Sequence, residues 1–439
     1  MTTISPERRR EIIGALRKGT VPQRGLDFLA VGLQRFEGVI AEELSDAAQG
    51  GSIFKAVRGE YGCGKTFFAR WVQESAKKNG FATAEVQISE AETPLHRLET
   101  VYRRAMEQLS TPDCFLGAFR SVLDGWFYGL EEDVLAEGNI DPQDQRALAE
   151  RADELLEQRL AEITRATPQF ASALRAYRSA QRAGDHATAE GLAGWLAGQP
   201  HIAASLKRQA GIKGDVDHFA ALSFLRGLLL ILKDSGYSGL VLVLDEIETI
   251  QRVRSDVREK GLNALRQLID DIDSGRFPGL YLVITGTPAF YDGPQGIQRL
   301  EPLAQRLHVD FQTNARFDNP RAVQLRLATF DHDRLVEVGK KVRDLFAADC
   351  SAPDRVKRLA NNDYLESLAK AMTGKLGGKV GIAPRLFLKK LVSDVLDRID
   401  QFDDFDPRQH YELTVNSNEM TSVEREAQAR NVDDIDLEI

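Results

Sequence analysis

One segment of the sequence combines closely spaced glycines with a lysine and a hydroxyl group. It fits the pattern Gly-x-x-x-x-Gly-Lys-[Ser/Thr], and its residues are Gly59, Glu60, Tyr61, Gly62, Cys63, Gly64, Lys65 and Thr66, followed by Phe67. Such a loop binds polyphosphate, because glycines let backbone N–H groups converge on phosphate oxygens and the next helix adds its positive end. We expect Lys65 to reach the β- and γ-phosphates and Thr66 to bind Mg²⁺. A glycine turn with a surface lysine is the less specific alternative.

A second set of candidates is a pair of acids at the end of an apolar run. Residues 240–244 are all Leu or Val, and Asp245 and Glu246 follow directly. Ligands of open α/β sheets bind at the carboxyl ends of the strands, so we expect Asp245 to hold Mg²⁺ and Glu246 to polarise the attacking water. Many strands end at solvent-exposed acids, which is the alternative interpretation. Glu248 fits a cap of the next turn equally well.

Three further residues are weaker candidates. Thr285 ends the apolar run 280–284 and is favoured over Thr287 as a residue that senses the γ-phosphate, although a turn-forming hydroxyl fits as well. Arg306 is a candidate arginine finger for an adjacent subunit, with Arg299 as competitor and a plain surface arginine as the alternative. Arg385 follows Pro384 at a predicted helix start, from which it can swing over the phosphates.

The elements around these residues alternate between strand and helix. Short apolar runs predict strands over 52–58, 84–88, 239–244 and 280–284, and wider apolar periodicity predicts helices between them. We therefore predict an α/β fold with a parallel sheet, interrupted by a helical insertion and followed by a helical lid without strands. The expected segments are 1–50 (N-terminal), 51–129 (first part of the core), 130–215 (insertion), 216–319 (second part of the core), 320–400 (lid) and 401–439 (acidic tail, expected to be disordered).

Composition and charge limit the kinds of function that we expect for this chain. The 439 residues carry a net charge of −9, contain three scattered cysteines and include no run of about 18 uncharged apolar residues. The N-terminus has no export signal, so we expect a cytoplasmic protein without a membrane anchor, a disulfide framework or a zinc site. Residues 401–439 hold eleven acids and three bases, whereas 334–398 hold fourteen bases and eight acids. That surplus favours a polyanion such as DNA, with a solvated helical surface as the alternative.

Together these motifs resemble those of AAA-type P-loop ATPases. More narrowly, 16–22 leading to Val31 and Gly32, 57–66, and 236–240 running into 244–248 resemble the BrxD family, the ATP-binding proteins of BREX phage-defence systems. The resemblance implies an ORC/Cdc6-like ATPase with Val31 and Gly32 near the adenine, acting beside a helicase or other defence proteins. Only 39 residues follow position 400, too few for a separate winged-helix domain, so sequence-specific DNA reading is not expected.

The leading hypothesis is a protein that binds and hydrolyses ATP with Mg²⁺ and drives or regulates a DNA-processing defence complex, as a homo- or hetero-oligomer. An ATP-gated scaffold with little hydrolysis is the first alternative, and a DNA translocase is the second, although no second set of helicase motifs is present. A signalling GTPase is disfavoured because the sequence lacks an Asn-Lys-x-Asp motif.

Overall fold

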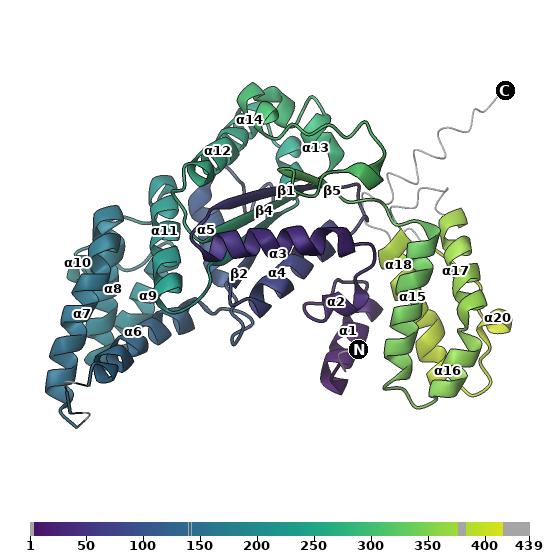
Figure 1. Cartoon of the computed structure of the whole chain (residues 1–439), viewed down its shortest axis with the longest axis horizontal. Coiled ribbons are helices and arrows are strands. Elements are labelled where there is room, and N and C mark those ends of the chain that lie inside the picture. Colours follow the sequence, from purple (N-terminus) through teal and green to yellow (C-terminus); the bar gives the residue numbers. More distant parts are fainter. Residues whose placement is uncertain (1–3, 139, 142, 376–382, 416–439) are drawn as a thin grey trace. The chain divides into compact units, whose positions relative to one another are not determined.

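The computed structural model in Figure 1 describes residues 4–138, 140–141, 143–375 and 383–415. In these residues one sheet has the strand order β2-β3-β4-β1-β5. Its strands are β1 (Ile53–Arg58), β2 (Ala82–Gln87), β3 (Leu240–Asp245), β4 (Leu280–Gly286) and β5 (Gln324–Arg326). Strand β3 pairs in parallel with β2 on one side and with β4 on the other. The predicted α/β class with a parallel sheet is confirmed.

The two central apolar runs form strands because both of their faces are covered. Every residue of β3 and of β4 is buried, as a parallel sheet between helices requires. The strands begin where Gly239 and Gly279 approach each other, and the Leu240 N–H donates to the Gly279 carbonyl at 2.9 Å. A side chain at Gly239 would lie 2.2 Å from that carbonyl oxygen, so only glycine fits there.

The expectation that strands stop at about residue 320 is wrong, because β5 follows at Gln324–Arg326. This strand has three residues and begins with a polar side chain, so it lacks the apolar run that marks the others. Tertiary contacts define it instead. The Leu327 N–H donates to the Arg58 carbonyl at 2.9 Å, and Arg58 Nη1 donates to Gln324 Oε1 at 3.0 Å.

Contacts divide the chain into two compact units, each made of separate stretches of sequence. Unit 1 comprises the described parts of 1–40, 57–74 and 309–439, and unit 2 comprises those of 41–56 and 75–308. Strand β1 and the helices α3 (Gln34–Ala48) and α4 (Lys65–Lys78) contribute residues to both units.

Unit 2 carries strands β2, β3 and β4 and the helical insertion, which is gathered at one end of the unit in Figure 1. Aspartates cap three of its helices: Asp144, Asp185 and Asp217 accept hydrogen bonds from backbone N–H groups three residues on. The helical elements of unit 2 are α5 (Leu98–Glu107), α6 (Phe119–Ala136), α7 (Gln145–Ala166), α8 (Pro168–Arg182), α9 (His186–Leu196), α10 (Ala204–Gln209), α11 (His218–Asp234), η1 (Ile247–Arg252), α12 (Ser255–Asp273), α13 (Pro288–Asp292), η2 (Ile297–Arg299) and α14 (Glu301–Arg306). Helix α6 spans the predicted start of the insertion at residue 130.

A buried polar triad fixes the sheet to its covering helix within unit 2. Glu43 on α3 forms an ion pair with Lys55 of β1 at 2.5 Å and accepts a hydrogen bond from Tyr281 of β4 at 2.6 Å. Lys55 is 2% exposed, and burial raises the pKa of Tyr281 well above its ordinary value. The three groups satisfy one another, which offsets the cost of burying them.

Unit 1 contains a helical lid with its own apolar core. Helix α1 begins with Pro6 at its first position, Ser5 accepts a hydrogen bond from the Arg8 N–H, and Arg17 forms a two-bond ion pair with Asp397. The other helical elements of the unit are α2 (Leu26–Leu29), η3 (Ala315–Phe317), α15 (His332–Ala347), α16 (Pro353–Leu359), α17 (Asn362–Lys375), α18 (Ala383–Lys390), the π-helical η5 (Leu391–Leu396), α19 (Asp397–Gln401) and α20 (Pro407–His410).

Residues 401–415 differ from the expected disordered tail. Leu413 is 6% exposed in the lid core, and the Tyr411 hydroxyl donates to Asp394 at 3.2 Å. The apolar side chains at Phe405, Tyr411 and Leu413 make this packing possible despite the many acids around them. The rest of the predicted tail, 416–439, lies outside the described residues.

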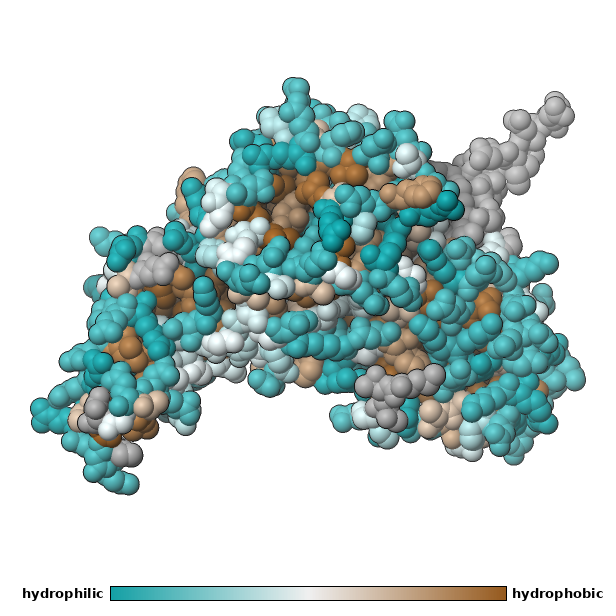
Figure 2. All heavy atoms as spheres, viewed as in Figure 1, coloured by the Kyte–Doolittle hydropathy of each residue, from teal (hydrophilic) through white to brown (hydrophobic). Residues whose placement is uncertain are grey.

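The surface of the described residues is largely polar. Figure 2 shows a mostly hydrophilic face with small, separate hydrophobic areas. No helix among the described residues is long and apolar enough to cross a membrane.

Candidate nucleotide site

The glycine-rich segment forms a loop between β1 and α4, as predicted, and its conformation depends on glycine. Gly62 and Gly64 have φ values of +77° and +93°, in the region that side chains disfavour. A side chain at Gly59 would lie 2.3 Å from Cys63 Sγ. The loop can therefore fold tightly enough to turn its N–H groups inward at the start of α4.

Lys65 opens α4 and turns back over the loop. Its Nζ donates to the carbonyls of Gly59 and Glu60 at 2.9 and 3.3 Å, and it lies 4.9 Å from the ring centroid of Tyr61. Lys65 is 8% exposed, and these two hydrogen bonds hold its ammonium group against the loop. Thr66 is next to it on the first turn of α4, so the cation and the hydroxyl are presented together at a helix N-terminus.

Cys63 is a structural member of the loop. The side chain is 4% exposed, and burial raises the pKa of its thiol. A protonated, buried thiol is a poor nucleophile, so no covalent chemistry is assigned to Cys63.

In unit 2, the acid pair lies at the carboxyl edge of β3. The Thr285 hydroxyl of β4 donates to Asp245 Oδ1 and accepts a hydrogen bond from the Glu246 N–H at 3.2 Å. Thr285 is fully buried, so its hydroxyl holds the acid pair from within the protein and is not exposed at the edge of the sheet. Thr287 is 4% exposed.

Glu246 is positioned by its backbone and by a second side chain. Its φ of +58° is left-handed, a conformation that costs a residue with a side chain roughly 1–2 kcal/mol. Gln87, the last residue of β2, donates from Nε2 to Glu246 Oε2 at 2.9 Å. Gln87 was not among the sequence candidates, and the available signal was a polar residue near the end of the strand predicted over 84–88.

Other sequence candidates lie elsewhere. Arg306 Nη1 contacts Asp270 and Asp273 of α12 at 2.5 and 2.9 Å, whereas Arg299 makes two long hydrogen bonds of 3.4 Å. Glu248 is 3% exposed within η1.

The N-terminal and lid candidates belong to unit 1. Val31 is buried, and Gly32 has a left-handed φ of +72°. Arg385 is half-buried on α18, with Nη1 3.5 Å from the position of a Cβ on Gly19.

The donor set suits Mg²⁺ only in combination with a phosphate ligand. The described residues contain no group of three or more His, Cys, Asp or Glu side chains arranged to hold a metal. Thr66 and Asp245 offer a hydroxyl and a carboxylate, the hard oxygen ligands that Mg²⁺ prefers, and Mg²⁺ commonly takes its other ligands from water and phosphate.

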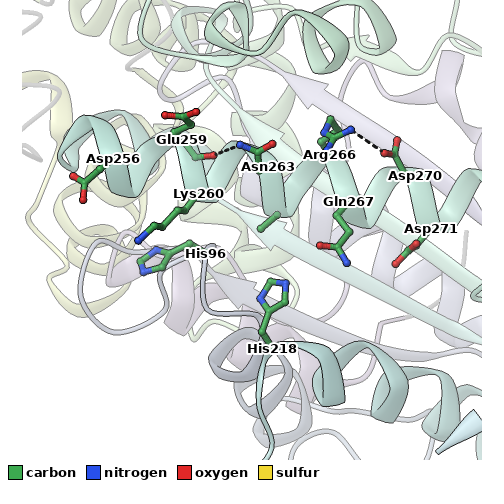
Figure 3. A pocket seen from close by; sticks show the side chains of 11 residues that line it. His96, His218, Asp256, Glu259, Lys260, Asn263, Arg266, Gln267, Asp270 and Asp271 are labelled. Atoms are coloured by element: carbon green, nitrogen blue, oxygen red, sulfur yellow. Dashed lines mark hydrogen bonds and ion pairs between the residues drawn. The ribbon is translucent and has the colours of Figure 1, made fainter.

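A separate polar hollow of about 750 Å³ lies along α12 in unit 2 (Figure 3). Lys260 points towards His96, and burial, followed by the nearby Arg97 and Lys260 charges, lowers the pKa of that imidazole. None of the predicted site residues lines this hollow. This hollow is therefore separate from the residues that the sequence predicts for the nucleotide site.

Comparison with family models identifies the family of the chain. Residues 4–415 match the model of a family described as the BREX system ATP-binding protein BrxC/D. The chain belongs to this family. The predicted resemblance to the BREX ATP-binding proteins is therefore confirmed across nearly the whole chain, and ATP is the nucleotide that the family description names.

The similarity of this BREX family member to solved structures and curated proteins is weaker than its match to the family model. The chain is similar to one in the structure of Drosophila ORC bound to DNA, with 14% identity, 90% of this chain and 69% of that chain covered, and a TM-score of 0.29. No curated protein matches the chain.

Proposed function

We propose that this BREX ATP-binding protein hydrolyses ATP with Mg²⁺ and uses the turnover to drive or regulate a DNA-processing defence complex. The observation that carries the proposal is the fixed position of Glu246, a carboxylate held at the carboxyl edge of the sheet by Gln87 and by its own backbone. A protein that only binds ATP has no need of a carboxylate held in a strained conformation at this edge.

Each residue of the proposed site has a separate role in the reaction. Lys65 and the loop N–H groups bind the β- and γ-phosphates, and Thr66 and Asp245 hold the metal, which neutralises phosphate charge when bound. Glu246 orients and deprotonates the attacking water. Thr285 acts through Asp245, which it fixes by its hydroxyl. The strand order supports this division, because β1, which leads into the loop, neighbours β4 and belongs to the same sheet as β3.

The lid and a second subunit complete the site in this account. Arg385 lies on α18 and is our candidate for a lid cation over the phosphates. A trans arginine would contribute on the order of 10³-fold to turnover. Arg306 must break its ion pairs with Asp270 and Asp273 to serve in that role, whereas Arg299 need only break two long hydrogen bonds.

One observation favours the alternative of an ATP-gated scaffold with little hydrolysis. The hydrogen bond from Gln87 occupies one oxygen of Glu246, so that oxygen is less available to an attacking water. Partner binding would then be required to release Glu246.

The test is the rate of ATP hydrolysis by the full chain with Mg²⁺ and with a chelator, alone and with single- or double-stranded DNA, at two salt concentrations. Metal-dependent turnover that rises with DNA supports the ATPase. Tight ATP binding with no turnover under any of these conditions favours the scaffold.

A further inference from the structure

The polar hollow along α12, called the α12 hollow below, brings together side chains that have no partner within the protein. Its volume of about 750 Å³ is in the range of sites that bind small molecules. Figure 3 shows Lys260 and Gln267 extending from α12 towards the wall that carries His96 and His218. Among the described residues, no hydrogen bond or ion pair holds any of these side chains. Each of them therefore has hydrogen-bonding capacity left for a ligand.

Two cations lie near His96 at one end of the α12 hollow. Burial lowers the pKa of the His96 imidazole, the charges of Arg97 and Lys260 lower it further, and Glu99 acts in the opposite direction. The imidazole is therefore neutral at pH 7, in surroundings where positive charge outweighs negative charge. An anion at this end would reduce the repulsion among these groups and accept a charge-assisted hydrogen bond from Lys260.

The acids that line the α12 hollow do not neutralise Lys260. Glu259 points to the opposite side of α12 from Lys260 in Figure 3. The other acids are paired with arginines that are not part of the lining, at 3.0, 2.5 and 2.7 Å: Asp256, Asp270 and Asp271. The ammonium group of Lys260 is thus left for a ligand.

The two histidines are held in place by the elements that carry them. His96 follows a loop in which the Ser89 hydroxyl accepts hydrogen bonds from two backbone N–H groups, at 2.9 and 3.1 Å. His218 begins α11, and Asp217 caps that helix at 2.8 Å. A wall that is fixed before a ligand binds reduces the entropy lost on binding.

The other end of the α12 hollow offers an acceptor. Figure 3 shows Asp271 beyond Gln267, at the end away from Lys260. Asp271 is 7% exposed, and its Oδ2 atom is buried without a hydrogen-bond partner among the described residues. A buried acceptor without a partner costs free energy, which a donor on a ligand would recover. The hollow therefore favours a ligand with a negative charge at one end and hydrogen-bond donors at the other.

We propose that the α12 hollow is a binding site, separate from the nucleotide site, for a small phosphate-bearing molecule whose phosphate lies between Lys260, His96 and His218. A phosphate has enough acceptor oxygens to take a bond from each of these groups. The acids around the hollow repel an extended polyanion, so a small molecule is favoured over a nucleic-acid strand. The inference concerns unit 2 alone and does not depend on ATP hydrolysis.

The test follows the imidazole NMR signals of the full chain, with isotope-labelled histidine, during titration with inorganic phosphate or AMP at constant ionic strength. The signals that disappear in His96→Gln and His218→Gln are assigned to these residues, and both should shift. The pKa of His96 should rise, because the anion counteracts the charges of Arg97 and Lys260.

Lys260→Ala should weaken the binding of phosphate and AMP about tenfold, as the loss of one charge-assisted contact predicts. Lys213→Ala, which removes an exposed cation elsewhere in unit 2, is the control and should bind like the wild type. The melting temperature shows whether each variant is folded, and Lys260→Gln gives the answer if Lys260→Ala is not.

The inference is overturned if millimolar phosphate and AMP leave both histidine signals unmoved, or if the Lys260 variants bind like the wild type. Shifts caused by a single-stranded oligonucleotide but not by phosphate or AMP would assign the hollow to nucleic acid and also overturn it. Lys65→Ala separates the two sites, because Lys65 does not line the hollow and its loss must leave the histidine response intact. Loss of that response in Lys65→Ala would place the ligand in the loop instead.

Discussion

The side-chain amide of Gln87 donates a hydrogen bond to the carboxylate of Glu246 at 2.9 Å, joining the ends of neighbouring strands β2 and β3. The bond crosses 159 residues of sequence. It gives the carboxylate of Glu246 a fixed direction. Turnover should therefore depend on Gln87 as well as on the acid itself.

Gln87→Ala should lower basal ATP turnover by about tenfold, because Glu246 loses the hydrogen bond that fixes its direction. The measurement is steady-state ATP hydrolysis without partners. Glu90→Ala, an exposed change three residues away, serves as the control. Turnover above the wild-type rate would show that Gln87 restrains Glu246 and would contradict the orienting role.

Thr285→Val should lower the free energy of unfolding by about 1–3 kcal/mol, because Asp245 loses a buried donor while the side-chain volume is kept. Urea denaturation measures this loss. Thr285→Ser keeps the hydroxyl and should recover most of the stability. Equal stability of the valine variant and the wild type would contradict the role assigned to Thr285.

A chain that ends at residue 410 should be less stable than one that ends at residue 415. It loses the buried Leu413, whose removal from the lid core costs about 1.5–3 kcal/mol, and the Tyr411 bond to Asp394. Thermal denaturation of the two truncated chains checks the difference, and Leu413→Ala in the full chain should reproduce part of it. Matching melting temperatures would mean that 411–415 contribute nothing to the lid.

DNA binding, as the surplus of bases in 334–398 predicts, should be independent of sequence and fall steeply with salt. Lys357 and Arg358 are exposed on α16, so the double change to alanine should weaken binding and reduce the salt slope by about two. Arg208→Ala, on α10 in unit 2, is the control. Binding to one DNA sequence in strong preference to others would contradict this mode.

The sequence predicted the parts of the fold that local pattern determines. The fully apolar runs of β3 and β4 and the glycine-rich loop were clear because burial on both faces and the loop conformation leave few other residue choices. Strand β5 was missed because three residues beginning with Gln324 carry no periodicity, and its place in the sheet depends on tertiary bonds such as those to Arg58.

The sequence could name candidate site residues by motif but not their contacts. Lys65, Asp245 and Glu246 follow from spacing and strand ends, whereas the bond from Gln87 to Glu246 joins chain segments that meet only in the folded protein. The extent of the tail was misjudged for a related reason. Leu413 is a single apolar residue among acids, and its burial depends on the lid core that receives it.

The central claim, that Glu246 acts on water at a nucleotide site built around Lys65, is tested most directly by measuring ATP affinity and single-turnover hydrolysis in two variants. Glu246→Gln should bind ATP like the wild type and hydrolyse it at least about 100-fold more slowly, because the amide keeps the shape but cannot accept the proton. Lys65→Ala should lose ATP affinity, because the phosphates lose their charged partner. Hydrolysis by Glu246→Gln at the wild-type rate, or wild-type ATP affinity in Lys65→Ala, would contradict the account.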